Sequence, residues 1–141
     1  MEEERGPDGV DEATLLAAAG WADVPTARVL ASVATDRVAV MVLDSNGGLG
    51  GRPHETIEKL TRDDAGHWRS AGDLGPAAGG GAGWFDGHSY AYGQAEPGVS
   101  QVLATVSDEV VVCDVQVDRW WIGIVAYPEP WLGVAESVPL R

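Results

Sequence analysis

The chain has 141 residues and a formal net charge of −13, with 45% hydrophobic and 22% charged residues. This length is enough for one domain with a buried core, and the composition excludes a collagen-like or fully disordered chain. The negative charge disfavours nucleic acid and anionic lipid as partners, because both are themselves negative.

Hydropathy and cysteine usage predict a protein outside the membrane. The longest apolar run, residues 120–127, is far shorter than the roughly 20 residues that a membrane-spanning helix needs. The acidic start at Met1 is unlike a secretory signal, so we expect a cytoplasmic protein if Met1 is the native start. Cys113 is the only cysteine, which agrees with a reducing compartment. Lys59 is the only lysine among nine basic residues, a bias typical of GC-rich, actinobacterial coding.

The N-terminal part of the chain is expected to be a tail followed by one helix. Residues 1–9 combine like charges with glycine and proline, which predicts a disordered acidic tail. Residues 11–19 carry acidic residues in the first turn and then alanine and leucine, and Gly20 follows, so they predict a helix. A single β-rich domain is expected over residues 10–141.

Beyond the helix, the apolar pattern changes to the alternation of strands. Residues 29–33 and 38–43 predict two strands across a tight turn. The second is apolar on both faces, as expected for a central strand that is covered on both sides. Residues 55–62 and 67–70 predict a hairpin. The following segment, residues 71–83, is rich in glycine and is expected to be a long flexible loop.

The C-terminal half carries the clearest strand pattern. Residues 84–85 and 89–93 suggest one more strand. Residues 102–106, 111–117 and 120–127 then alternate between short turns and predict a three-stranded meander. The whole pattern predicts a mainly β protein: an antiparallel β-sandwich or flattened barrel of seven to eight strands with one N-terminal helix.

A resemblance supports this fold. The residues Pro97-Gly98-Val99, Val102, Val106, Val115, Val117 and Asp118-Arg119-Trp120 carry it. This segment resembles the C-terminal half of immunoglobulin-like β-sandwich domains in actinobacterial proteins of unassigned function. The resemblance covers about a third of the chain, implies a sandwich fold and implies no catalytic residue.

Motifs for cofactors and metals are weak. No glycine motif for a phosphate group is present, and we expect no cofactor. Asp44, Asn46 and Glu55 match positions 1, 3 and 12 of a calcium-binding loop, but Leu49 stands where the sharp turn needs glycine. The spacing is therefore interpreted as an ordinary turn, and no metal site is expected.

Candidate nucleophiles are equally sparse. The histidines His54, His67 and His88 fall in or beside loops. Asp86, His88 and Ser89 are the candidates for a small hydrolase or isomerase, because they could supply a carboxylate, a base and a nucleophile. The alternation around Cys113 predicts a buried and unreactive thiol.

Six tryptophans in 141 residues are the distinctive surplus. Trp68, Trp84 and Trp120 are expected in the core, and Trp84 is also a candidate for ligand or partner binding. Trp121, Tyr127 and Trp131, together with Trp84, would form an aromatic face for a flat ligand or a partner if they were exposed; the alternative is that the helix or the tail covers them.

Three functions follow from these features. The favoured one is a non-enzymatic binding or protein-interaction module with an aromatic face and a flexible glycine loop, whose partner is a protein or a hydrophobic small molecule. The alternatives are the hydrolase or isomerase at residues 86–89 and an acidic decoy that binds a basic protein. The sequence leaves the oligomeric state open.

Overall fold

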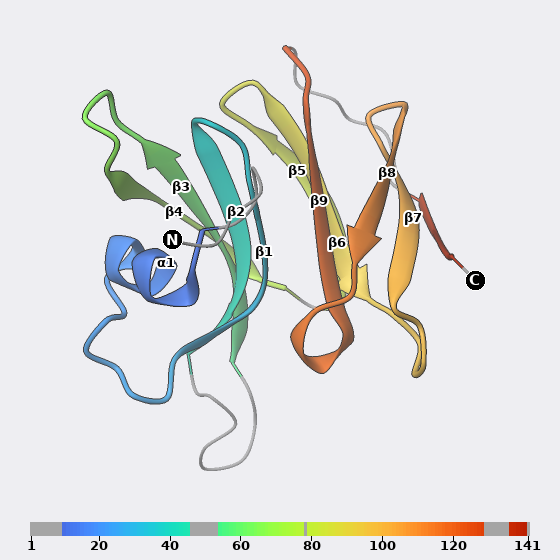
Figure 1. Cartoon of the computed structure of the whole chain (residues 1–141), viewed down its shortest axis with the longest axis horizontal. Helices are drawn as coiled ribbons and strands as arrows, with labels where there is room; N and C mark the ends of the chain where they lie inside the picture. Colours follow the sequence, from blue (N-terminus) through green and yellow to red (C-terminus); the bar gives the residue numbers. More distant parts are fainter. Residues whose placement is uncertain (1–9, 46–53, 78, 129–135, 141) are drawn as a thin grey trace, which may run out of the picture. The chain divides into compact units, whose positions relative to one another are not determined.

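The computed structural model describes residues 10–45, 54–77, 79–128 and 136–140 (Figure 1). The chain divides into two compact units, unit 1 (residues 1–77) and unit 2 (residues 78–141), and each is described by itself. The expected mainly β fold with one N-terminal helix is confirmed, and the strands pair antiparallel. The expected acidic tail lies outside the described residues, and the single domain over residues 10–141 stays a prediction.

Unit 1 consists of a helix and one sheet. Its elements are α1 (Glu12–Ala19), β1 (Arg28–Ala34), β2 (Val38–Asp44), β3 (Glu55–Arg62) and β4 (Trp68–Pro76). The four strands form an antiparallel sheet in the order β1-β2-β3-β4, so each strand pairs with its neighbour in sequence. The antiparallel pairings of β1 with β2 and of β3 with β4 confirm the two predicted hairpins. The chain between the strands of each hairpin is too short for a parallel connection.

A side chain bounds helix α1 at its N-terminus, and a glycine bounds it at its C-terminus. The Asp11 carboxylate accepts a hydrogen bond from the backbone N–H of Thr14 at 2.8 Å, which satisfies one of the free donors of the first turn. At the other end, Gly20 adopts φ +87°, and the N–H of Trp21 donates to the carbonyl of Leu16 at 2.8 Å. This glycine-terminated end confirms the helix expected over residues 11–19.

The core of unit 1 lies between α1 and the sheet. All seven residues of β2 are buried, as the apolar pattern on both of its faces predicted. Leu15 of α1 packs with Met41 and Leu43 of β2 and with Leu60 of β3. Trp68 is only half-buried and packs at the margin of this cluster, where the Arg62 guanidinium lies 5.6 Å from its ring centroid.

Unit 2 is a small sandwich of two three-stranded sheets (Figure 1). Its elements are β5 (Gly80–Phe85), β6 (His88–Gln94), β7 (Gln101–Val106), β8 (Glu109–Asp114), the 3-10 turn η1 (Val117–Arg119), β9 (Trp120–Ala126) and β10 (Glu136–Pro139). One sheet has the order β5-β6-β9 and the other the order β10-β7-β8. One apolar cluster joins them, with Ala91 and Trp121 from the first sheet and Val102, Ala104 and Cys113 from the second.

The glycine-rich segment is not a loop, contrary to the prediction for residues 71–83. Residues 71–76 continue β4, and residues 80–83 belong to β5. In β5 the glycines make room for large residues on the neighbouring strand. Cβ atoms at Gly81 and Gly83 would collide with the rings of Tyr92 and Tyr90, their register partners on β6. Close approach of a partner side chain, rather than backbone freedom, explains these two glycines.

The predicted C-terminal meander is also wrong in its last strand. β7 and β8 pair as expected, but β9 pairs with β6 in the other sheet. The turn at Asp118-Arg119, with φ of +54° and +70°, redirects the chain between the sheets. It is held to the end of β6, because the Arg119 guanidinium donates to the Ala95 carbonyl at 2.6 Å and Gln94 donates to the Asp118 carbonyl at 3.1 Å.

Candidate functional site

A pocket of about 470 Å³ opens in unit 2. β5 and the residue before it contribute residues 79–82, and β6 contributes residues 91–94. β9 contributes Trp121, and β10 contributes Glu136 and Ser137. Pockets for small organic ligands commonly have volumes of about 300–1,000 Å³, so this pocket has the size of a ligand site.

Small residues on paired strands create the space. Gly80 is the register partner of Gly93, and Ala82 is the partner of Ala91. Paired residues of antiparallel strands, and residues two apart on one strand, point to the same face, so these four residues share one face of the sheet. None of them carries a side chain larger than a methyl group. The hollow therefore follows from the sequence of β5 and β6.

Trp121 is seated over one of these glycines. Gly93 and Trp121 are register partners, and a Cβ atom at Gly93 would lie 3.1 Å from Cζ2 and 3.2 Å from Nε1 of the indole. The ring is 5% exposed, because it also belongs to the apolar cluster between the two sheets. Trp121 thus packs in the apolar cluster between the two sheets of unit 2, and its remaining exposed surface lines the pocket.

The pocket is acidic. Among the described residues that line it, Glu136 is the only one with a charged side chain, and Glu136 is exposed. Gln94 and Ser137 add polar groups, although the Gln94 amide already donates to the carbonyl of Asp118. None of the described lining residues is a lysine, an arginine or a histidine. The electrostatic field there favours a positively charged group over an anion.

The structure separates the aromatic residues that the sequence grouped together. Trp121 is buried, so it does not form an exposed aromatic face. Trp84 and Tyr127 are half-buried and contact each other, since the Trp84 indole N–H donates to the Tyr127 carbonyl at 2.8 Å, but neither lines the pocket. Trp131 lies outside the described residues. The binding role of these four residues stays a prediction, and Trp121 is the one that the pocket supports.

Sequence reasoning missed Tyr92. Alternation along β6 places Tyr90 and Tyr92 on one face, with ring centroids 6.2 Å apart and an angle of 21° between the planes. Burial raises the pKa of Tyr90 to about 12 and also raises the pKa of Tyr92. The relevant pattern is that each of these tyrosines on β6 lies opposite a glycine on β5. This pattern can be recognised only when the register between β5 and β6 is known.

The proposed hydrolase residues do not assemble. Asp86 has φ +51° and forms, with Gly87, the two-residue turn between β5 and β6. His88 and Ser89 are consecutive on β6 and therefore point to opposite faces. The His88 Nδ1 lies 2.9 Å from the Asp86 carbonyl oxygen, whereas Ser89 is fully buried and accepts a hydrogen bond from the Ser107 hydroxyl at 2.6 Å. This geometry does not support a shared catalytic centre.

The calcium-like spacing forms a strand end. One Asp44 carboxylate oxygen accepts a hydrogen bond from the backbone N–H of His54 at 3.1 Å, and the Ser45 hydroxyl lies 3.0 Å from His54 Nδ1. Strands β2 and β3 lead into and out of this region, and Asn46 lies outside the described residues. Within the described chain, no three residues of the His, Cys, Asp or Glu types gather as a metal site.

The remaining chemical candidates have structural roles. Asp63 accepts hydrogen bonds from the backbone N–H of His67 and from the Arg69 guanidinium, each at 2.9 Å, and both lower its pKa. Cys113 is buried as predicted, and burial raises the pKa of its thiol to about 11. A thiol in this state is a poor nucleophile near neutral pH.

Comparison of the chain with protein-family models, with curated proteins and with solved structures found no match. No helix in the described part of the chain is long and apolar enough to cross a membrane.

Proposed function

We propose that this protein is a binding module that holds a small organic ligand with a positively charged group in the pocket of unit 2. The observation that carries the proposal is the combination of Trp121, the glycine and alanine residues of β5 and β6, and Glu136 around one pocket of about 470 Å³. It keeps the tryptophan and the glycine-rich segment of the sequence-based hypothesis, but it moves the site from an aromatic face to a pocket.

The lining supports a cationic ligand on two grounds. An indole ring attracts cations through its quadrupole, which contributes about 0.5–2 kcal/mol. Glu136 of β10 supplies a carboxylate, and none of the described lining residues carries a basic side chain. The small residues leave room for the apolar body of such a ligand.

The test is a titration followed by nuclear magnetic resonance of the Trp121 indole N–H. The probes are 2-phenylethylamine, which is a cation at pH 7, and 3-phenylpropionate, an anion of similar size. We expect the amine to shift the indole signal with a dissociation constant of about a millimole per litre, as is typical of fragments this small, and the carboxylate to leave it unchanged. Equal binding of the two probes, or no shift with either, would contradict the proposal.

Two variants and one control locate the binding. Ala82→Trp fills the pocket from an exposed position and is expected to abolish the shift. Glu136→Gln removes the carboxylate and is expected to weaken binding of the amine about threefold or more. Glu109→Gln removes an exposed carboxylate of β8 that does not line the pocket, and it is expected to bind the amine like the wild type.

A further inference from the structure

The sheet β10-β7-β8 ends in an exposed strand without the usual protection of an edge. β8 is an edge strand of this sheet, and its pairing with β7 is regular from Glu109 to Asp114. Val110 and Val112 are 62% and 54% exposed. Edge strands of native proteins commonly carry a proline, a lysine or a bulge that prevents further pairing, and β8 has none of these.

Three other edge strands, β1, β4 and β10, are protected, whereas β5 and β9 pair regularly with β6 but differ from β8, because β5 is rich in glycine and β9 is mostly buried. β1 carries a bulge between Val29 and Ala31, and the pairing of β4 with β3 is irregular at two points. β10 has four residues and ends at Pro139. β8 therefore stands apart as a regular, valine-rich edge of six residues.

The hydrogen-bond pattern shows which backbone groups face outward. The N–H of Val115 donates to the carbonyl of Ser100 at 2.9 Å, so alternate residues of β8 from Val115 backwards bond to β7. The residues between them, Val110, Val112 and Asp114, turn their N–H and C=O groups away from β7. No backbone hydrogen bond of Val110 or Val112 to a third strand occurs within the described residues.

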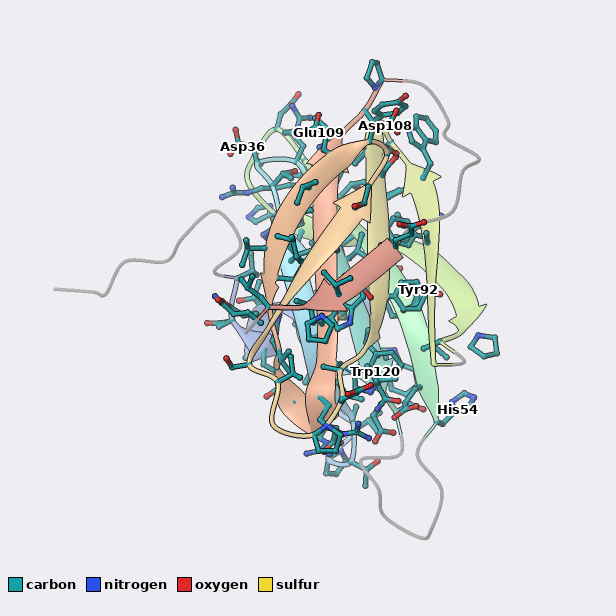
Figure 2. All side chains as sticks on the ribbon, turned by 90° about the vertical axis from the view of Figure 1, so that its right-hand side faces the viewer. Asp36, His54, Tyr92, Asp108, Glu109 and Trp120 are labelled. Atoms are coloured by element: carbon teal, nitrogen blue, oxygen red, sulfur yellow. The ribbon has the colours of Figure 1, made fainter. Side chains whose placement is uncertain are left out.

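The charges around this edge have one sign. Asp108 and Glu109 lie at the tip of the β7–β8 hairpin (Figure 2), and Asp114 lies at the other end of β8. β7, β8 and β10 contain no lysine, arginine or histidine. Opposite charges across a strand pair stabilise the pair, and like charges destabilise it.

We infer that β8 binds an extended protein segment that adds a strand to the sheet, with apolar residues at its centre and arginine or lysine at its ends. Main-chain hydrogen bonds from Val110 and Val112 would hold the segment, as in other complexes formed by strand addition. Its apolar side chains would cover the two valines, and its basic ends would meet Glu109 and Asp114. This surface lies at the opposite edge of the sheet from β10, which lines the pocket, so the inference does not depend on the proposed ligand.

A second copy of the chain fits this edge poorly. Two β8 strands that pair antiparallel through their outward-facing backbone groups, with Val110 of one copy opposite Val112 of the other, would place Asp108 of each copy opposite Asp114 of the other. These like charges, added to the net charge of −13 on each chain, oppose self-association.

The probe is a capped hexapeptide with arginine at both ends and alternating valine and threonine between them. Its control has glutamate at both ends. We expect the wild-type protein to bind the arginine peptide and not the glutamate peptide, measured by calorimetry. Hydrogen exchange of the Val110 and Val112 amides is expected to slow when the arginine peptide is present, because these amides become hydrogen-bonded.

Two matched variants test the location. Val112→Lys adds a positive charge to β8, and Val138→Lys adds the same charge to β10 at an equally exposed site, since both valines are 54% exposed. We expect Val112→Lys to weaken peptide binding about tenfold or more and Val138→Lys to change it less than about twofold. Far-ultraviolet circular dichroism establishes that both variants keep the fold.

Three results would overturn the inference. The first is the absence of binding of the arginine peptide to the wild type. The second is an equal loss of binding in both variants, which would place the peptide elsewhere. The third is a dimer in light scattering that Val112→Lys dissociates, which would identify a second copy as the occupant of the edge.

Discussion

The buried apolar cluster of unit 1 consists of leucine, alanine and methionine, whereas the cluster between the two sheets of unit 2 combines the Trp121 indole with valine, alanine and cysteine. In unit 1 the fully buried strand β2 lies between β1 and β3, and Leu15 of α1 covers one face of the sheet. In unit 2 the inner face of β5 and β6 carries small residues, and Trp121 occupies the space above Gly93. Side chains of similar size pack together in the core of unit 1. In unit 2, small residues beside the large Trp121 indole leave a pocket.

Binding sites in a small β protein can arise where its sheets leave an edge or a hollow uncovered. A sheet covered by a helix has few backbone groups or hollows open to a ligand. A sandwich of two three-stranded sheets has four edge strands. The apolar cluster between the two sheets of unit 2 contains the large Trp121 side chain. Unit 2 accordingly carries both candidate surfaces, the pocket beside β10 and the exposed edge of β8.

The largest expected effect is on the core of unit 1. Leu60→Ala removes a fully buried side chain and is expected to lower the free energy of unfolding by about 2–5 kcal/mol, because it leaves a cavity. Urea unfolding followed by circular dichroism measures it. Val112→Ala in unit 2 is the control and is expected to cost less than about 0.5 kcal/mol, since this side chain is exposed. A loss below about 1 kcal/mol for Leu60→Ala would show a core that closes over the cavity.

The second prediction concerns the pH dependence of unit 2. Burial, and then the Asp114 carboxylate, raise the pKa of Cys113 from 9.0 to about 11. The unfolded chain therefore loses the thiol proton first, so the stability due to the neutral thiol is complete below pH 9 and is lost as the pH rises towards 11. We expect the free energy of unfolding to fall by about 2–3 kcal/mol over this interval.

Urea unfolding of the wild type and of Cys113→Ala at several pH values isolates this contribution. Tyr90, with its pKa raised to about 12, adds a decline above pH 10 in both proteins, so the difference between the two curves is the quantity to compare. Parallel curves would show that the thiol is less buried than the structure indicates.

The third prediction tests the tight packing of unit 2 directly. A Cβ atom at Gly123 would lie 2.8 Å from Cys113 Sγ, so Gly123→Ala is expected to lower the free energy of unfolding by about 1–3 kcal/mol. In a Cys113→Ala background the sulfur is absent, and the same substitution is expected to cost less. A double-mutant cycle with no coupling between the two sites would contradict this contact.

The smallest predicted effect concerns the helix of unit 1. Asp11→Ala removes the carboxylate that accepts a hydrogen bond from Thr14, and it is expected to cost about 1 kcal/mol in urea unfolding. Asp11→Asn and Asp11→Ser keep an oxygen acceptor and are expected to retain most of the stability. Equal losses in all three variants would mean that the charge, rather than the hydrogen bond, stabilises the helix end.

Much of unit 1 could be predicted because its signals are local. The Asp11 cap and Gly20 bound the helix, the run of apolar residues from Val38 to Leu43 identified a central strand, and a short turn forced β3 and β4 to pair. The buried thiol of Cys113 followed from alternation in the same way. Each of these features depends on residues close together in the sequence.

The candidate sites could not be predicted, because they depend on contacts between distant residues. Residues 79–83 are consistent with a flexible loop until Tyr92 and Tyr90 are placed against Gly81 and Gly83. The partner strand of β9 could not be predicted either. The turn at residues 118–119 would allow β9 to pair with β8, but in the structure β9 pairs with β6. The expected aromatic face was lost for the same reason, because the partners of Trp121 lie elsewhere in the chain.

The β-rich fold, the N-terminal helix and the strong acidity could be inferred from the amino-acid sequence, and so could the weakness of its catalytic motifs. These properties follow from composition, from period-two alternation and from residues within a few positions of one another. The pocket beside Trp121 and the exposed edge of β8 became visible only in the folded chain. A side chain is buried or free according to which distant strand lies against it, and strand order is set by the packing of the whole sheet.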